Sequence, residues 1–513
     1  MMGMCARLRQ TVHLLVGLIL MLGAVAPAYA HVGNKDVFEQ VSAGAYKLFI
    51  TIRTPTVIPG VATVEVRASG DSGAHATAIR ITPVPLTGEA SLHPPTADAM
   101  KASADDASFF TGSLWLMASG SWQVRLDVDG SAGPATAGVP VAAVALSILP
   151  MQRRLGITLA VLGIILALGM AGIVGAAVRE SRLARGVVPT PARRQRAAMA
   201  AGTTLVVMAF AIAGGDKWWK VSAADYAADI YRPSDLHATL SGDTLDLSVG
   251  NFVVKQGRWK ADSNDELLLD HGHLMHLYAI RMPEMDAVFH LHPAPVGEKH
   301  LTLNLPAMPP GSYKLYADVV HLNGFPETLT ATLTVPPGLA AAPLGAEDAM
   351  ALPMPLDGGD LGSSCKLLDG YTMVWDKPAS ITANTAYTFR FHLLDRDGHP
   401  AGDVQPYLGM AGHAAFVKAD GSAFAHTHPD GSAAMPAMML ANPGSSEMSG
   451  MAAAANMAGD MADMPGMAMT AAKPLPPVVE FPYGFPSLGR YRIFIQMKHG
   501  RTVETGVFDA EVR

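Results

Sequence analysis

Two long apolar segments in the middle of the chain constrain its fold most. Residues 155–178 and 197–215 contain no charged side chain, and each is long enough to cross a bilayer as a helix. The loop between them, 179–196, holds six arginines and one glutamate, an excess of positive charge that marks the cytoplasmic side. We predict a transmembrane hairpin with the lipid bilayer as a partner and the rest of the chain on the outer side.

The N-terminus has the pattern of a secretory signal peptide. Two arginines precede an apolar run at 12–25, and Ala28-Tyr29-Ala30 follows, which is typical of a cleavage site. Cleavage there would leave His31 as the first mature residue; the alternative is an uncleaved anchor. Residues 1–30 are therefore left out of the fold prediction.

The cysteine content argues against a disulfide-stabilised fold, and the charge argues against a nucleic-acid-binding protein. Cys5 would leave with the signal peptide, and Cys365 would remain alone, so no intramolecular disulfide can form. A buried free thiol is one reading of Cys365; intermolecular pairing or soft-metal ligation is the other. The net charge of -7 is mild and the basic residues cluster in 179–196, which gives no support for nucleic-acid binding.

Residues 31–150 follow the pattern of a small β-sandwich. Tyr46, Leu48, Ile50 and Ile52 alternate with other residues, the period of two that is typical of strands. Turns rich in proline and glycine recur about every ten residues, as in a sandwich.

The C-terminal part contains a tandem duplication. Residues 275–293 align with 412–429, and 311–321 align with 489–499 without a gap. We predict two related β-modules, 232–336 and 363–513, joined by a flexible linker at 337–362. The predicted fold is mainly β, with three Ig-like or cupredoxin-like sandwiches on a two-helix transmembrane hairpin.

The second module brings three histidines to one strand face. Asp420-Gly421 is a strong two-residue hairpin turn, and pairing outward from it sets His413 opposite His428. His426 lies on the same face because side chains two residues apart share a side of a strand.

The first module repeats this arrangement. A three-residue turn at 283–285 would set His276 opposite His292, with His290 beside them. Three imidazoles on one patch suit a transition-metal site, with a further position filled by water, His321, His499 or a methionine. The alternative is that these histidines cap loop carbonyls.

A second pair of histidines lies just before the first patch. Asp270, His271 and His273 add further candidate ligands. A solvated strand edge is the alternative reading of this segment.

Methionines are concentrated after the second patch. Thioether sulfur selects Cu(I) or Ag(I), and the surrounding segment 431–475 has no helical apolar stripe, which predicts a disordered loop that wraps a monovalent ion. The alternative is that the methionines reflect only compositional drift in an alanine-rich segment and bind no metal. The ten methionines are Met435, Met438, Met439, Met448, Met451, Met457, Met461, Met464, Met467 and Met469.

His31 suggests a further copper ligand. A free N-terminal amine and its own imidazole can chelate Cu(II) if another histidine comes near. His75 and His93 are the other histidines of that domain, and a plain mature N-terminus is the alternative.

Three N-terminal blocks, 31–38, 54–60 and 112–122, resemble the FixH-like and YtkA-like group of extracytoplasmic β-sandwich domains. The two C-terminal modules resemble the outward modules that accompany this domain in bacterial membrane proteins. The resemblance implies a bacterial inner-membrane protein with its bulk in the periplasm, linked to copper homeostasis or to the metal supply of an oxidase.

Together these features predict a non-enzymatic, membrane-anchored periplasmic copper-binding protein, with silver as an alternative ion. Its role would be metal homeostasis, tolerance or delivery to a membrane partner such as a copper exporter or an oxidase. No nucleophile triad, phosphate loop or carboxylate pair stands out in the sequence. The alternatives are an assembly module without metal, which would hold a partner membrane protein, and a copper-dependent oxidoreductase.

Overall fold

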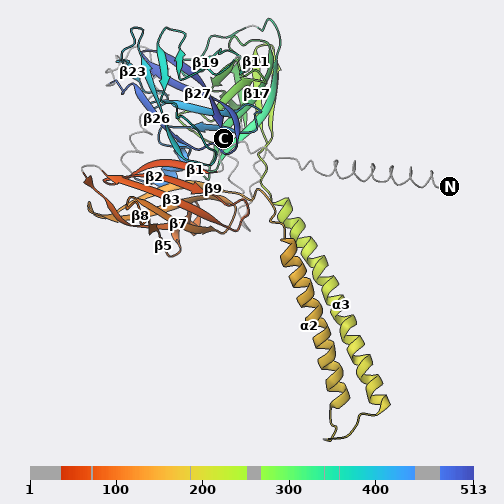
Figure 1. Ribbon diagram of the computed structural model, residues 1–513. Coiled ribbons are helices and arrows are strands. Elements are labelled where there is room, and N and C mark those ends of the chain that lie inside the picture. Colours follow the sequence, from red (N-terminus) through yellow and green to blue (C-terminus); the bar gives the residue numbers. More distant parts are fainter. Residues whose placement is uncertain are drawn as a thin grey trace, which may run out of the picture.

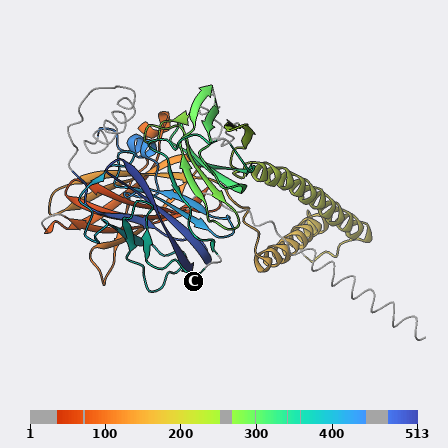
Figure 2. The same ribbon diagram turned by 90° about the horizontal axis from the view of Figure 1, so that it is seen from above.

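The computed structural model describes residues 36–513 apart from 71–72, 185, 251–266, 298, 340, 357–358 and 445–473. It has a β-rich body and two long helices that extend away from it (Figures 1 and 2). This confirms the predicted mainly β fold with two apolar helices. The predicted signal peptide and His31 lie outside the described residues.

The N-terminal unit is a sandwich of two antiparallel sheets around one core. The sheet orders are β1-β2-β3-β7-β6 and β5-β4-β8-β9, and both sheets contribute alternate side chains to a shared apolar core. The strands are β1 (Val37–Ala43), β2 (Tyr46–Arg53), β3 (Gly60–Gly70), β4 (Ala76–Pro85), β5 (Asp98–Ala99), β6 (Lys101–Ala102), β7 (Phe109–Leu116), β8 (Gly120–Gly130) and β9 (Ala135–Ala143), with a 3-10 turn at Glu89–Leu92.

The helices α2 (Arg153–Glu180) and α3 (Pro191–Ala228) are long and apolar enough to cross a membrane. Their apolar side chains are exposed along almost their whole length. The helix α3 continues past the predicted end at 215 and includes Trp218 and Trp219. Near its end, the hydroxyl of Tyr226 accepts a hydrogen bond from the backbone N–H of Ile58, so the helix is joined to the sandwich.

The first C-terminal module has two sheets, with orders β10-β11-β16-β15 and β12-β17-β13-β14-β19, and β18 pairs with β17. They enclose a core of leucines and other apolar residues. The strands are β10 (Leu236–Ser241), β11 (Thr244–Val249), β12 (Leu267–Leu268), β13 (His276–Arg281), β14 (Val288–Leu291), β15 (Ala294–Gly297), β16 (His300–Asn304), β17 (Gly311–His321), β18 (Pro326–Val335) and β19 (Ala349–Ala351).

The second module repeats this design, with orders β20-β21-β22-β26 and β23-β27-β24-β25, and β28 pairs with β27. Its core is richer in aromatic residues. The strands are β20 (Ser364–Lys366), β21 (Thr372–Trp375), β22 (Tyr387–Leu394), β23 (Val404–Gln405), β24 (His413–Lys418), β25 (Phe424–Thr427), β26 (Val478–Tyr483), β27 (Gly489–His499) and β28 (Thr502–Val512).

The two modules pack face to face through their duplicated hairpins. In each hairpin one strand face points into the module's own core and the other points at the partner module, because side chains alternate along a strand. Tyr278 and Ile280 of β13 lie in one apolar cluster with Ala415 and Val417 of β24. This contact fixes the position of the histidines that continue the same faces.

Two predicted flexible segments are partly ordered. In the segment expected as a linker, β19 pairs with β14 and extends the sheet of the first module. In the expected methionine-rich loop, a short helix, α4 (Met435–Ala441), buries its first turn and packs against Leu86 beside the N-terminal sandwich. Tertiary contacts therefore order pieces too short to have a recognisable period of their own.

Candidate metal centre

The two hairpins have the register that their turns predict. Leu277 pairs with Leu291 in the first module, and Ala414 pairs with Thr427 in the second. One further step along each ladder sets His276 opposite His292 and His413 opposite His428. The reasoning from turn type therefore gives the correct strand faces.

The two predicted patches meet in one cluster between the modules. The His276 ring centroid lies 6.3 Å from that of His413 and 5.2 Å from that of His426. The histidine cluster contains eight imidazoles, namely His271, His273, His276, His290, His292, His413, His426 and His428.

Six of the eight form two triads. Triad A consists of His271, His413 and His428, and triad B of His276, His290 and His292; within each, one ring nitrogen per residue lies within 4.8 Å of the others. Metal–nitrogen bonds are about 2 Å long, so a small inward movement of the rings would let each triad surround one ion.

The remaining two histidines lie beside the triads. The ring of His426 lies between them, 5.3 Å from His413 and 5.5 Å from His290. The ring of His273 stacks on His292 at 4.1 Å, and its Nε2 lies 2.9 Å from a carboxylate oxygen of Glu347.

The sequence indicates His271 as a candidate ligand beside the first patch, whereas the structure places it in triad A with two histidines of the second patch. This residue lies in the loop before β13, at a left-handed φ of 50°, and its side chain crosses to the second module to complete triad A. Its Nδ1–H donates to the carbonyl of Leu408 at 2.7 Å. The signal in the sequence was a third His-x-His motif, at 271–273, which resembles those at 290–292 and 426–428.

Most ring orientations are fixed by partners on Nδ1. In triad B, His292 Nδ1 lies 3.0 Å from Asp348 Oδ1 and His290 Nδ1 lies 2.8 Å from Gln496 Oε1. His426 Nδ1 faces Asp318 Oδ2 at 3.3 Å. Such outer partners hold a metal-binding imidazole in one tautomer and leave Nε2 for the ion.

His276 has the opposite arrangement. Its Nε2 lies 3.1 Å from the carbonyl oxygen of Asp270, while its Nδ1 faces His290 Nε2 at 3.1 Å. It would therefore offer Nδ1 to an ion.

Six ring nitrogens of the cluster lack protein partners in the described part of the chain. Buried polar atoms are nearly always hydrogen-bonded, so a concentration of exceptions at one place points to a ligand. Among the described residues the following cluster atoms have no hydrogen-bond partner: the Nε2 atoms of His271, His292, His426 and His428, and both ring nitrogens of His413.

Burial keeps these imidazoles neutral. Desolvation lowers the pKa of His271 and of His428 to about 4 and that of His290 to about 3. The same cause, together with neighbouring histidines, lowers the pKa of four more: His276, His292, His413 and His426. At neutral pH the rings are in the form that binds metal ions.

Neither histidine expected to complete a patch does so. His321 Nε2 lies 2.9 Å from Glu327 Oε2, and His321 belongs to neither triad. His499 stacks on Tyr371 and pairs with Asp369 at 2.9 Å, and it belongs to a separate group of possible metal ligands with Asp369 and Glu504. His321 lies three residues after Asp318 on β17, and His499 lies three residues after Gln496 on β27; Asp318 and Gln496 are residues of these strands that contact cluster histidines. At the more distant positions, the carboxyl groups of Glu327 and Asp369 contact the imidazoles instead.

Three of the ten methionines fall in the described residues, and they are helical. Met435 in α4 is buried, and its backbone N–H donates to Asp270 Oδ1 beside triad A at 3.3 Å. Met438 packs on the sandwich core, and Met439 is exposed. The following lie outside the described residues: Met448, Met451, Met457, Met461, Met464, Met467 and Met469.

A cavity of about 150 Å³ reaches the cluster from the side of the N-terminal sandwich. His426 and His428 line it together with Asp270 and Asp318, and Trp122 of β8 lines it from the N-terminal sandwich. Burial raises the pKa of Asp318 to about 7.

A family model matches the second C-terminal module. Residues 366–513 match a family described as a domain of unknown function (DUF8832). A search among curated proteins finds no match.

Solved structures show weak overall likeness. A putative membrane anchored protein from Corynebacterium diphtheriae is 10% identical, with 93% of this chain and 96% of that chain covered and a TM-score of 0.15. A tetra-tandem repeat of a large adhesion protein is 8% identical, with 89% and 71% covered and a TM-score of 0.14. Dimeric latent PorU from Porphyromonas gingivalis is 9% identical, with 93% and 34% covered and a TM-score of 0.13.

Proposed function

We propose that this chain is a membrane-anchored, extracytoplasmic copper-binding protein of a bacterial inner membrane, whose centre is the histidine cluster. The observation that carries the proposal is the set of buried, neutral ring nitrogens that point into the cluster without a protein partner. A fold that leaves this many buried ring nitrogens unpaired is stabilised when a metal ion binds them.

The donor set favours copper over other transition ions. The two triads offer imidazole nitrogen alone, which suits copper, zinc and nickel. For a given nitrogen site, divalent copper binds most tightly in the first transition series. The neighbouring methionine-rich segment adds thioethers, which select Cu(I).

The anchor and the methionines favour a role in copper handling on the outer side of the membrane. The arginine-rich loop lies between α2 and α3, at the end of the helix pair away from the β-rich body (Figure 1), and such loops stay in the cytoplasm. The cluster would then hold copper in the periplasm, for tolerance or for delivery to a partner membrane protein.

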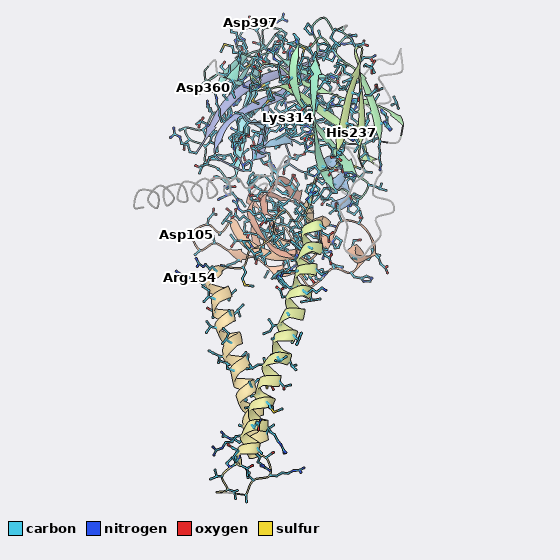
Figure 3. The ribbon with its side chains drawn as sticks, turned by 90° about the vertical axis from the view of Figure 1, so that its right-hand side faces the viewer. Asp105, Arg154, His237, Lys314, Asp360 and Asp397 are labelled. Atoms are coloured by element: carbon cyan, nitrogen blue, oxygen red, sulfur yellow. The ribbon has the colours of Figure 1, made fainter. Side chains whose placement is uncertain are left out.

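The test is a copper titration of the full chain, purified in detergent and stripped with a chelator. We expect tight Cu(I) and Cu(II) binding at the cluster. Replacing His271 or His413 with alanine should remove the ion held by triad A, whereas His237→Ala should change nothing, because His237 is exposed on β10 (Figure 3).

Two results would contradict the proposal. One is wild-type protein that binds no copper against a competing chelator. The other is copper binding that is the same in the wild type, the His271→Ala variant and the His237→Ala control. Metal analysis of protein isolated from its own membrane would identify the ion held in the cell.

A further inference from the structure

We infer that triads A and B hold a coupled pair of copper ions, and that this pair in its Cu(I) state reduces dioxygen. The inference rests on the proposed function and adds a reaction to it. Binding alone requires only that copper occupy the cluster, whereas reaction as a pair requires that the two ions lie close together, each with an open position.

The number of ligands exceeds the capacity of one ion. Transition ions with imidazole ligands commonly take about four protein donors, and the cluster supplies eight imidazoles. They are divided into two groups of three with convergent nitrogens. The cluster therefore accommodates two ions without any residue from elsewhere.

The two groups are in contact. Between triads, the His271 ring lies 6.2 Å from that of His276, and the His290 ring lies 6.3 Å from that of His413. Within triads, the corresponding distances run from 4.6 Å for His290–His292 to 5.3 Å for His276–His290. Since the nearest rings of the two triads are only slightly farther apart than rings within one triad, two ions would occupy adjacent sites in one buried cluster, with His426 between them.

Each ion would keep an open position. Three imidazoles leave room for a fourth ligand on each ion. The histidine cluster is buried, and the cavity that reaches it is small and largely lined by apolar side chains. A small neutral molecule that bridges two ions fits this geometry, and dioxygen is such a molecule.

The step balances as a two-electron reduction. Each Cu(I) gives one electron and becomes Cu(II), and dioxygen takes two electrons and two protons to form hydrogen peroxide. The protons enter along the cavity, past the carboxyl groups of Asp270 and Asp318. An external one-electron donor, such as ascorbate in the assay, returns the copper to Cu(I).

The first experiment loads the full chain with two equivalents of Cu(I) without oxygen, adds dioxygen, and records oxygen uptake and the EPR signal. We expect one dioxygen consumed for each pair of copper ions. We also expect a Cu(II) signal well below the total copper, because the two spins are coupled. Full signal intensity in the wild type would overturn the inference.

The variants test each half of the pair. His271→Ala removes a ligand of triad A and His292→Ala a ligand of triad B. Each should retain one ion, lose oxygen uptake down to the rate of copper-free protein, and give the full EPR signal of its remaining copper. The exposed His399 on the second module, changed to alanine, is the matched control.

Loading wild-type protein with both Cu(I) and Ag(I) tests the pair without variants, so the result does not depend on whether a variant folds. Wild-type protein that carries equal amounts of Cu(I) and Ag(I) should consume less dioxygen per copper than protein loaded with Cu(I) alone, since Ag(I) breaks up the pairs. Uptake per copper that stays the same would overturn the inference while leaving copper binding intact. Failure to bind copper at all would instead overturn the proposed function.

Discussion

Metal-free protein should lose stability steeply when the pH falls from 7 to 5. Seven buried histidines of the cluster have a folded-state pKa below the ordinary value of 6.5, chiefly because burial penalises the charged form. The unfolded chain takes up protons at these residues near pH 6.5, whereas the folded chain does so only at a much lower pH. Unfolding is therefore favoured as the pH falls through this window.

Buried carboxyl groups with a raised pKa oppose part of this loss of stability. An acid with a raised folded pKa contributes stability that is present at low pH and is lost as the pH rises through that pKa. Five acids have a raised pKa, mainly through burial: Glu39, Asp270, Asp318, Asp348 and Glu504. On unfolding, each of the seven histidines gains a proton and each of the five acids loses one. The unfolded chain therefore still binds two more protons than the folded chain.

Two protons correspond to a slope of about 3 kcal/mol per pH unit. Between pH 6 and pH 5 the loss is thus comparable to a large part of the stability of a typical domain, about 5–15 kcal/mol. The histidines with pKa values of about 3 to 4 stay neutral in the folded protein throughout this range, so the slope should persist to pH 5.

The assay is urea unfolding of chelator-treated full chain in detergent, followed by tryptophan fluorescence, to which the buried Trp375 of the second module contributes. His413→Leu should reduce the slope by about one proton, or roughly 1.4 kcal/mol per pH unit. His237→Leu, an exposed control, should leave it unchanged. A urea midpoint that stays constant from pH 7 to pH 5 would refute the reasoning, because it would mean that the imidazoles titrate as in water.

Three further predictions follow from individual contacts. Asp348→Asn should weaken copper binding at triad B by about 10–100-fold in a chelator competition, because Asp348 orients His292; equal weakening at both triads would argue against this role. Deletion of 445–473 should lower the Cu(I) stoichiometry and leave Cu(II) binding unchanged, as measured by titration, and an unchanged Cu(I) stoichiometry would contradict it. Gly431→Ala should destabilise the protein by about 1–3 kcal/mol in thermal melts, because Gly431 has a φ of 149° and a Cβ there would clash with the carboxylate of Glu39; a melt equal to that of the wild type would exclude this strain.

The local geometry of the cluster was predictable from the sequence. A two-residue turn at Asp420-Gly421 fixes which residues oppose each other, and period-two alternation fixes which share a face. These rules place His413 opposite His428 and His276 opposite His292 without reference to the contact between the modules.

The meeting of the two patches was not predictable from alternation alone. A strand buried on both faces carries apolar residues at consecutive positions, and β24 contains the run Ala414 to Val417. That run signals a second buried face, but not which surface covers it. The reach of His271 across the interface depends on the left-handed backbone of its loop, and no periodic pattern encodes that conformation.

The short ordered segments β19 and α4 were not predicted from the sequence, because each is too short to be stable without its neighbours. The strand β19 has three residues and α4 has seven, lengths at which isolated pieces are unstable in water. Each is held by neighbours: β19 by its ladder with β14, and α4 by contacts with the sandwich and by the bond from Met435 to Asp270.

The two ring nitrogens of several cluster histidines differ in their partners, as expected for histidines that bind metal. If the rings only stabilised the interface, both nitrogens would find protein partners, as buried polar atoms generally do. Instead, His271, His292 and His428 each have a partner on Nδ1, while Nε2 of each has none among the described residues. This one-sided pattern is the one that metal-binding imidazoles require. It implies that copper at about 100 times its dissociation constant should stabilise the protein by about 3 kcal/mol, a rise in melting temperature that removal of His271 should reduce and removal of His237 should not.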